Sequence, residues 1–215
     1  MNTPARQLFE DAYQNRTAPW VIGEPQPAIV ALEATGAIRG AVLDIGCGLG
    51  EHTIMLTRLG YDVVGVDYAD GAVQQARENA AAAGVDARFA VGDAMALGAD
   101  AAVGTEWDTI LDSALFHIFG DDDRPRYVAS LHRGLKPGGV LHVLALSDAG
   151  RGFGPEVSET VIREAFATGW DLLSLDTTTY RGVVGAQHAE AIGLPAGTVV
   201  DEPAWLASFS VASVR

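Results

Sequence analysis

The segment 41–53, which reads Ala-Val-Leu-Asp-Ile-Gly-Cys-Gly-Leu-Gly-Glu-His-Thr, is the feature that most constrains the fold of this chain. A short apolar run carries Asp44 near its end, and a helical pattern that stops at Gly60 follows. Between them stand three glycines at alternate positions: Gly46, Gly48 and Gly50. Glycine permits positive φ and lets a ligand lie against bare backbone. We therefore predict a strand, a tight turn and a helix whose N-terminus offers free N–H groups and a positive dipole end.

Two classes of ligand use such a turn. A dinucleotide fold requires G-x-G-x-x-G, with the third glycine beside a pyrophosphate. In this chain that position is Glu51, whose carboxylate would repel a pyrophosphate. The G-x-G-x-G spacing, with an acid two residues before the first glycine, resembles motif I of the class I S-adenosylmethionine (SAM) methyltransferases. SAM carries an ammonium group and no phosphate, so an acidic neighbourhood is compatible with it. A glycine turn that only serves packing remains the alternative.

A second acid, Asp67, ends the apolar run 61–67 that begins just after Gly60. Asp67 lies 21 residues beyond Gly46. This is close to the offset of about 20 residues at which an acid meets ribose hydroxyls in nucleoside-binding folds. We expect its carboxylate to accept hydrogen bonds from both ribose hydroxyls. The alternative, a helix N-cap, fits the nearby Asp70 better.

Composition limits the partners of the chain. A length of 215 residues suits one domain, and the net charge is −14 without a Lys/Arg cluster. This charge argues against nucleic acid and against anionic membranes. No apolar stretch approaches the ~20 residues of a membrane span, and the N-terminus lacks a signal-peptide core. The single Cys47 cannot form an internal disulfide, and no Cys/His spacing indicates a metal site. We expect a cytoplasmic monomer or homodimer that acts on a small molecule.

Helix and strand patterns alternate along most of the chain, which predicts an α/β fold: a Rossmann-like, doubly wound, seven-stranded sheet. The last two strands have no helix between them, so we expect a mostly parallel sheet with an antiparallel edge. We predict a single domain 1–215, with an N-terminal helical lid over 1–36 and a core over 37–215. The segment 181–203 is long for a hairpin connection, and long loops tend to be functional or mobile. The expected helices are 4–14, 26–35, 50–59, 70–83, 122–135 and 158–168, and the expected strands are 41–45, 62–66, 86–91, 107–112, 140–146, 170–180 and 204–213.

Ligands of open α/β sheets bind at the carboxyl ends of the strands, near the switch in strand order. The third strand ends near Asp93, which could accept a hydrogen bond from the adenine amino group while Ala94 and Met95 pack on the ring. The fourth strand ends near Asp112, and its tip should face the methionine half of SAM. His117 follows there as the histidine nearest the reacting atoms.

The chain resembles small bacterial class I methyltransferases related to thiopurine S-methyltransferase and the tellurite-resistance methyltransferases. More narrowly, it resembles actinobacterial enzymes that methylate small aromatic or heterocyclic compounds. The matching stretches are 18–27, 43–52, 112–119 and 135–139. The resemblance implies that the Pro-Trp segment at 19–20 folds over SAM and the acceptor. In this group the residue after the tryptophan is usually acidic, whereas here it is Val21, and the segment 181–203 is longer than usual.

These arguments give two sets of candidate site residues. The residues expected to bind the cofactor SAM are Trp20, Asp44, Gly46, Cys47, Gly48, His52, Thr53, Asp67, Tyr68, Gly92, Asp93, Ala94, Asp112 and Ser113. The residues expected to bind the acceptor are Tyr13, Trp20, Phe116, His117, Phe119 and His188. Core packing is the alternative for Tyr13, and exposure at the surface is the alternative for His188.

The predicted activity is transfer of the SAM methyl group to nitrogen or oxygen of a small aromatic or heterocyclic acceptor, in secondary metabolism or detoxification. Alignment of the reactants supplies most of the catalysis, and a base is needed only if the acceptor must lose a proton. His117, with an ordinary pKa of about 6.5, is the candidate catalytic base; orienting the acceptor, or binding backbone or SAM, is its alternative role. Other functions remain open: a thiol or halide methyltransferase, a non-catalytic SAM-binding protein, and a nicotinamide-dependent oxidoreductase, which Glu51 and the lack of a Tyr-x-x-x-Lys pair disfavour.

Overall fold

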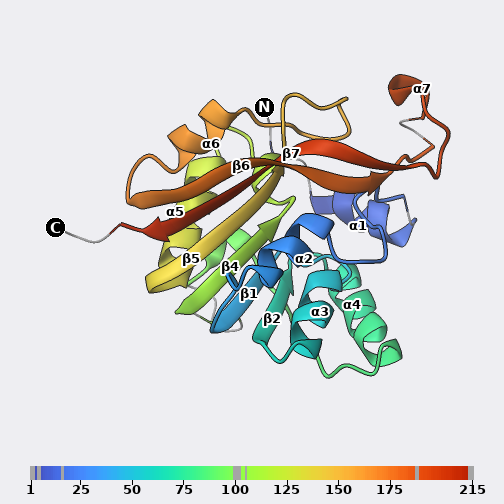
Figure 1. The fold of residues 1–215 in the computed structure, drawn as a ribbon. Helices are drawn as coiled ribbons and strands as arrows, with labels where there is room; N and C mark the ends of the chain where they lie inside the picture. The colour runs from blue at the N-terminus through green and yellow to red at the C-terminus, as the bar shows by residue number, and fades with distance from the viewer. Residues whose placement is uncertain are drawn as a thin grey trace.

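The computed structural model describes residues 3, 6–15, 17–98, 103–104, 106–186 and 189–212. Helices and strands alternate along these residues, as the sequence pattern predicts (Figure 1). The strands are β1 Ala41–Ile45, β2 Asp62–Asp67, β3 Arg88–Val91, β4 Trp107–Ser113, β5 Leu135–Leu146, β6 Trp170–Val183 and β7 Val199–Val211. The α-helices are α1 Arg6–Gln14, α2 Pro27–Ala34, α3 Glu51–Arg58, α4 Asp70–Ala82, α5 Arg124–Gly134, α6 Glu159–Ala165 and α7 Ala189–Ile192, with the short 3₁₀ helices η1 Ala94–Ala96 and η2 Phe116–Ile118.

The described strands form one seven-stranded sheet in the order β3-β2-β1-β4-β5-β7-β6. Strands β1 to β5 are parallel, and β7 runs antiparallel to both β5 and β6. The predicted α/β sheet with an antiparallel region at one edge is therefore confirmed. The antiparallel strand itself lies second from the edge, and β6 is the edge strand. Strand order reverses between β1 and β4, and a crevice opens at such a switch beyond the carboxyl ends of the strands.

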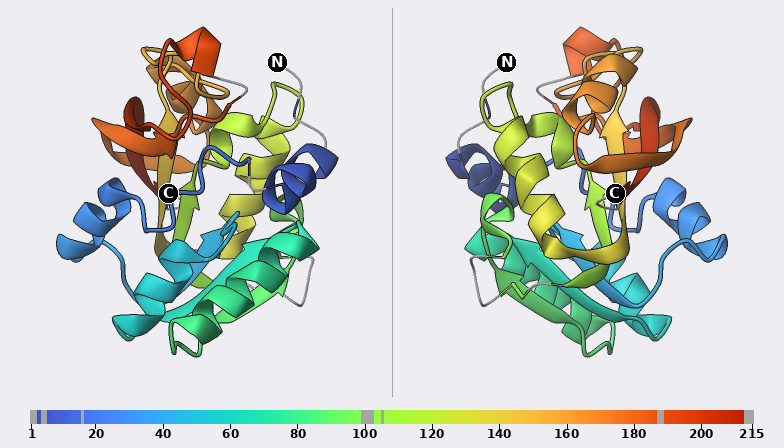
Figure 2. Two further views of the ribbon diagram at one scale, coloured as in Figure 1. Left: turned by 90° about the vertical axis from the view of Figure 1, so that its right-hand side faces the viewer. Right: turned by 90° about the vertical axis from the view of Figure 1, so that its left-hand side faces the viewer.

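Helices cover both faces of the sheet (Figure 2). Successive side chains of a strand point to opposite faces, so Leu43 and Val42 of β1 belong to different cores. Leu43 packs in a cluster with residues of α5 and α6, whereas Val42 packs with residues of α2 and α3. These two apolar layers fix the sheet, and with it the strand ends that build the site.

The N-terminal region divides differently from the prediction of a lid over 1–36. Helix α2 begins with Pro27 at its first turn and buries Ile29 and Leu32 in the same core as Val42 of β1. The side chain of Gln26 is hydrogen-bonded to both backbone groups of Arg181 in β6, at 2.8 Å each. Residues from 26 onward are therefore part of the core, because their apolar face is needed to cover the sheet. A lid can comprise at most the segment before them.

The hairpin of β6 and β7 extends further than predicted. Pairing continues to Val183 opposite Val199, so the connection that was expected over 181–203 shortens to 184–198 and contains α7. A cross-strand ion pair helps to explain the extension, since Arg181 Nε lies 2.8 Å from Asp201 Oδ1. Gly182 and Pro203 hid these strand ends in the sequence, because glycine and proline are depleted in strands. Figure 1 shows the turn of this hairpin on the same side of the molecule as α1.

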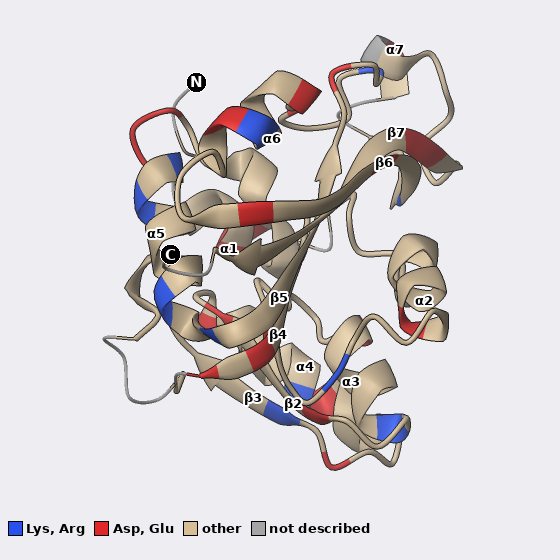
Figure 3. Cartoon of the chain, turned by 60° about the vertical axis from the view of Figure 1, so that its left-hand side comes forward, with Lys and Arg blue, Asp and Glu red and all other residues tan. Residues whose placement is uncertain are grey.

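Basic residues are dispersed over α3, α5, α6 and β3 (Figure 3). Several are paired with acids on the same helix or at its start, such as Arg163 with Glu159 and Arg126 with Asp123. Within the described ranges, no helix is both long and apolar enough to cross a membrane. The absence of nucleic-acid partners stays a prediction.

Candidate functional site

Two adjoining cavities lie beyond the carboxyl ends of β1, β2 and β4. The Asp67 cavity has a volume of about 210 Å³ and is lined by Asp67, Gly92, Asp93 and neighbours. The His117 cavity has a volume of about 140 Å³ and is lined by His117, Ser113 and aromatic residues. The two cavities share four wall residues: Gly46, Tyr68, Leu115 and Ile118. This arrangement suits a ligand with two arms that meet at the glycine turn.

The glycines of the turn have different physical roles. Gly46 has a φ of +71° and lines both cavities, and a Cβ there would lie 3.0 Å from Leu115. A Cβ on Gly48 would lie 3.0 Å from the hydroxyl of Tyr13. Gly50 instead faces the ring of Phe89, at 2.8 Å from the position of a Cβ. Gly46 keeps bare backbone at both cavities, Gly48 lines neither cavity and leaves room for the Tyr13 hydroxyl, and Gly50 allows close packing of helix on strand.

Asp67 is fixed at the wall of the cavity that carries its name. Its side chain is 6% exposed, and its two oxygens accept the backbone N–H groups of Gly48 at 3.0 Å and Ala69 at 2.9 Å. Burial raises the pKa of the carboxyl group, and these two N–H groups oppose that effect. An ionised carboxylate has about four acceptor positions, so hydroxyl donors can still be accommodated.

The far wall of the Asp67 cavity contains Gly92, Asp93, Ala94 and Met95. One oxygen of Asp93 accepts the N–H of Met95 at 2.8 Å and caps η1, which orients the exposed carboxyl group. Phe119 lines this cavity and not the His117 cavity. The structure therefore moves Phe119 from the expected acceptor wall to the other cavity, because η2 turns the chain between them.

Besides Asp112, five predicted cofactor residues line neither cavity: Asp44, Cys47, Gly48, His52 and Thr53. Asp44 accepts the hydroxyl of Thr53 at 2.6 Å, and both side chains are buried. Nε2 of His52 accepts the backbone N–H of Gln26 at 3.1 Å. These side chains brace the turn from beneath, where the sequence predicted direct contact with the cofactor.

Asp112 has a bracing role as well. One carboxylate oxygen accepts the N–H groups of Leu115 at 2.9 Å and Phe116 at 3.1 Å, and the other accepts the hydroxyl of Tyr127 at 2.7 Å. These bonds hold a strained turn in which Ala114 has a φ of +70°. Asp112 therefore differs from its predicted role, since its carboxylate is already occupied by donors of the protein. Burial raises its pKa to about 6.

A pH dependence of stability follows from Asp112. Its pKa in the folded protein exceeds the ordinary 3.8, so the folded state holds this proton more tightly than the unfolded state does. The resulting stabilisation is present below about pH 4 and is lost as pH rises through about 6. Asp112→Asn removes this contribution. The free energy of unfolding of the wild type minus that of the variant should fall by about 3 kcal/mol between pH 3.5 and pH 7.5. This value corresponds to a shift of roughly two pKa units. Urea unfolding at both pH values measures it, with the exposed Asp70→Asn as control, and a constant difference would contradict it.

Phe116 and Ser113, which were both predicted to lie at the site, differ in position: the first is in the core and the second lines the His117 cavity. Phe116 is 0% exposed and packs on Phe166 with ring centroids 5.4 Å apart, so it belongs to the core and lines neither cavity. The prediction that Phe116 contacts the acceptor therefore does not fit the structure. Ser113 does line the His117 cavity, and its buried hydroxyl has no hydrogen-bond partner among the described residues.

His117 lines the cavity with a ring whose proton position is determined by its neighbour. The side chain is 4% exposed, and Nδ1 accepts the backbone N–H of Leu146 at 2.9 Å. Burial lowers the pKa of His117 to about 4, so the ring is neutral at physiological pH. A neutral imidazole whose Nδ1 accepts a hydrogen bond carries its proton on Nε2. Within the cavity, His117 can therefore donate a hydrogen bond, and it cannot take up a proton at Nε2 while this bond persists.

Aromatic side chains from distant parts of the chain complete the His117 cavity. Tyr13 and Trp20 both line it, as predicted, and Trp20 Nε1 donates to the Tyr13 hydroxyl at 3.2 Å. Phe9, Phe153 and Tyr180 also line it, and the sequence did not single them out. Phe9 lies four residues before Tyr13, on the same face of α1, whereas Phe153 and Tyr180 carry no local signal. His188 lies outside the described residues.

Comparisons with known proteins identify the family. Residues 42–139 match a family model described as a methyltransferase domain. The chain is 34% identical over 185 residues to the 2-heptyl-1-hydroxyquinolin-4(1H)-one methyltransferase of Mycobacteroides abscessus. This match covers 79% of this chain and 79% of the relative. It is 27% identical over 154 residues to a probable thiol methyltransferase of Arabidopsis thaliana, with 71% of this chain and 67% of the relative covered.

A solved structure agrees with these relatives. It comes from work on the conversion of a disulfide bond into a thioacetal group during echinomycin biosynthesis, and it superposes with a TM-score of 0.84 at 35% identity. The match covers 95% of this chain and 92% of that structure. The glycine turn and the acid at the end of β2 lie beside the switch in strand order between β1 and β4. The chain therefore belongs to the class I SAM-dependent methyltransferases.

Proposed function

We propose that this protein transfers the methyl group of SAM to a nitrogen or oxygen atom of a small aromatic or heterocyclic acceptor. The observation that carries the proposal is the His117 cavity, which is aromatic-walled, adjoins the glycine turn and contains an imidazole N–H. Its walls favour flat, apolar rings, and its polar groups favour a ring that bears a hydrogen-bond acceptor. The hydroxyquinolinone named for the relative at 34% identity is a compound of this kind. Such chemistry belongs to natural-product metabolism or detoxification.

The residues of the Asp67 cavity fit the nucleoside half of the cofactor. Asp67 would accept the ribose hydroxyls, and Asp93 with Phe119 would flank the adenine. Bare backbone at Gly46, where a Cβ would crowd Leu115, supplies the cradle for the arm that passes into the second cavity. When bound, SAM supplies a methyl group on a positively charged sulfur, which is an activated leaving group.

The protein's own contribution is orientation. His117 Nε2–H would bind an oxygen or nitrogen of the acceptor beside the atom that is methylated, and this contact would align the acceptor for in-line attack. Because His117 is neutral and protonated at Nε2, we propose an orienting donor and not a general base. Acceptors that must lose a proton would do so to solvent, before or after binding.

A second candidate acceptor is sulfur. It is favoured by the name of the thiol methyltransferase relative and by the subject of the superposed structure, a disulfide converted into a thioacetal. A thiolate is a strong nucleophile at neutral pH and needs no base from the protein. It would also accept a hydrogen bond from His117 more weakly than oxygen does.

The proposed function is tested with purified protein, SAM and a panel of small acceptors: hydroxyquinolinones, phenols, N-heterocycles, aryl thiols and iodide. Product masses and kcat/KM are measured for each. We expect the highest kcat/KM among aromatic oxygen or nitrogen acceptors. Preferential methylation of thiols would replace the proposal by the second candidate, and SAM binding without any transfer to the panel would contradict both.

The role proposed for Asp67 makes a separate prediction. Asp67→Ala removes a charged acceptor of the ribose hydroxyls, and a hydrogen bond to a charged group contributes about 1.5–3 kcal/mol. We expect SAM to bind roughly ten- to a hundredfold more weakly, as measured by calorimetry. Asp70→Ala, at an exposed acid three residues on, is the matched control and should bind SAM normally. An unchanged dissociation constant in folded Asp67→Ala would reject this role.

A further inference from the structure

We propose that Phe153 forms the end wall of the His117 cavity and sets how long a substituent the acceptor can carry. This inference rests on the proposed function, because it concerns the acceptor side of the same cavity. Phe153 is buried and lines the cavity together with Gly154 and Pro155. These three residues lie on the loop 148–157 between β5 and α6, far in sequence from every residue that the cofactor arguments identify. Three features of the structure hold the ring in place.

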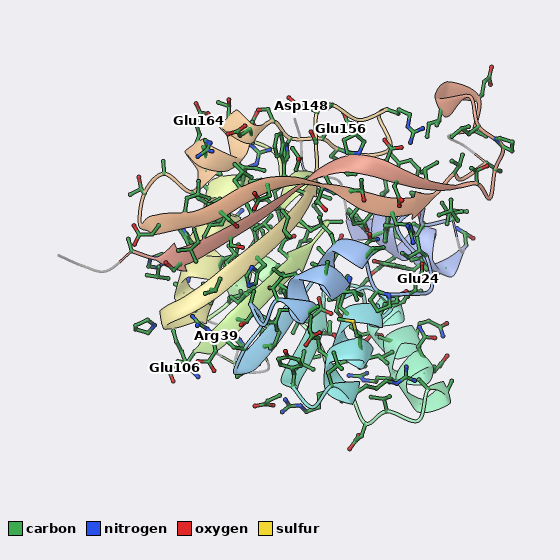
Figure 4. The ribbon with its side chains drawn as sticks, in the orientation of Figure 1. Glu24, Arg39, Glu106, Asp148, Glu156 and Glu164 are labelled. Carbon is green, nitrogen blue, oxygen red and sulfur yellow. The ribbon has the colours of Figure 1, made fainter. Side chains whose placement is uncertain are left out.

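The first feature is a loop that is closed on itself. Ser147 and Val157 form a parallel bridge at its base, and the N–H of Val157 donates to the carbonyl of Leu146 at 3.0 Å. Inside the loop, Glu156 Oε1 accepts the N–H of Gly152 at 2.8 Å. Figure 4 labels Asp148 and Glu156 on this loop, above the sheet. The backbone that carries Phe153 is thus fixed on both sides of the ring.

The second feature is a buried anchor on β7. Glu202 is 1% exposed, and its carboxylate accepts the backbone N–H of Arg151 at 3.1 Å and the Nε of the same residue at 2.8 Å. The Nη2 of Arg151 lies 2.6 Å from the carboxylate as well. Both guanidinium nitrogens contact Oε1 and the backbone N–H binds Oε2, so these charge-assisted hydrogen bonds hold Arg151 through both oxygens of the carboxylate. The loop is therefore tied to the sheet two residues before Phe153.

The third feature is the packing of the Phe153 ring against Gly182 of β6. A Cβ added to Gly182 would overlap Cε1 of Phe153 and would lie 3.1 Å from the carbonyl oxygen of Pro19. Because Gly182 has no side chain, the ring of Phe153 can pack against the backbone of β6 and leave more of the cavity free. Val184 and Val200 pack behind the ring, at the base of the extended hairpin connection. Val184, the first residue of the connection 184–198, therefore supports the acceptor wall together with Val200 of β7.

Two substitutions move the wall in opposite directions. Phe153→Ala removes the ring and lengthens the cavity, so acceptors with longer substituents should bind better. In Gly182→Ala the new methyl group occupies the space of the Phe153 ring and moves the ring toward the cavity, so longer substituents should bind more weakly. A difference of one or a few methylenes in an apolar pocket changes discrimination by roughly 10- to 200-fold. The double variant lacks the ring that the new methyl group would displace, so it should behave like Phe153→Ala.

The test uses 1-hydroxyquinolin-4(1H)-ones with methyl, propyl, pentyl, heptyl and nonyl chains at the ring carbon next to nitrogen. Dissociation constants are measured by calorimetry on protein saturated with S-adenosylhomocysteine, and kcat/KM is measured with SAM. We expect the preference for nonyl over methyl to rise at least about tenfold in Phe153→Ala and to fall at least about tenfold in Gly182→Ala. Gly71→Ala, where a Cβ meets nothing within 4 Å, is the control and should keep the wild-type profile.

Other outcomes reject the wall. If Phe153→Ala keeps the wild-type preference for chain length, the proposal is overturned. It is also overturned if the double variant keeps the profile of Gly182→Ala, because the contact of the new methyl group with Pro19 would then explain the change in preference. If Gly182→Ala does not fold, Phe153→Ala and the double variant still decide. Binding without methylation of any member would reject the proposed function alone, because the binding profile tests the wall independently. Failure of every member to bind both wild type and Phe153→Ala would overturn the wall.

Discussion

Deletion of residues 1–24 is expected to leave a folded protein that no longer transfers a methyl group. The segment supplies Phe9, Tyr13 and Trp20 to the His117 cavity, and Pro19 accepts the backbone N–H of Val183 at 2.8 Å. We propose that it acts as a lid over SAM and the acceptor, because it supplies one aromatic side of a cavity that Ser113, His117 and Tyr180 of the core also line. Without it, water enters and the reactants lose their alignment, so turnover should fall below roughly a thousandth of the wild-type rate.

The fold should survive this deletion because α2 begins at Pro27 and buries its apolar face in the core. Far-UV circular dichroism checks that the shortened protein is folded. In the full chain, SAM should protect Trp20 from acrylamide quenching. Trp20→Phe is the matched control, since the difference between the two proteins isolates Trp20 from the other tryptophans. Full turnover by the shortened protein would show that the segment is not a lid.

His117→Ala is expected to lower kcat roughly 10²- to 10³-fold with nearly unchanged SAM affinity, the usual effect of removing one preorganised donor. The variant loses the N–H that orients the acceptor and leaves the N–H of Leu146 without its partner. His117→Asn should recover much of the rate at every pH, because its carboxamide can accept from Leu146 and donate to the acceptor.

The pH profile distinguishes a donor from a base. The lowered pKa of His117, about 4, means that the ring is neutral at every pH above about 5. With an acceptor that does not titrate, kcat should be flat from pH 6 to 8 and should fall only as pH drops toward 4. An inflection near pH 6.5 that disappears in His117→Ala would show instead that the histidine acts as a base. A fully active His117→Ala variant would show that His117 is neither an orienting donor nor a base.

Local signals in the sequence were sufficient for the fold and for one half of the site. The strand, glycine turn and helix at 41–58 follow from periodicity and from the need for positive φ. Asp67 follows from its distance along the chain and from its position at the end of a strand. Such features are predictable because neighbours in the sequence determine them.

The other half depends on contacts between distant residues. Phe116 stands next to His117, and only its contact with the ring of Phe166, just after α6, assigns Phe116 to the core and leaves His117 at the cavity. The proton position on His117 depends on Leu146, which lies on β5. Phe153 reaches the cavity because Glu202 of β7 anchors its loop, and no spacing in the sequence relates those two residues.

The crystal structure of a ternary complex, with S-adenosylhomocysteine and the acceptor that gives the highest kcat/KM, tests the central claim most directly. We expect the adenosine in the Asp67 cavity with its ribose hydroxyls on Asp67. The acceptor ring should lie in the His117 cavity, with a ring oxygen or nitrogen about 3 Å from His117 Nε2 and the methylated atom facing the sulfur. An acceptor bound outside this cavity, or bound there with no contact to His117, would contradict the account.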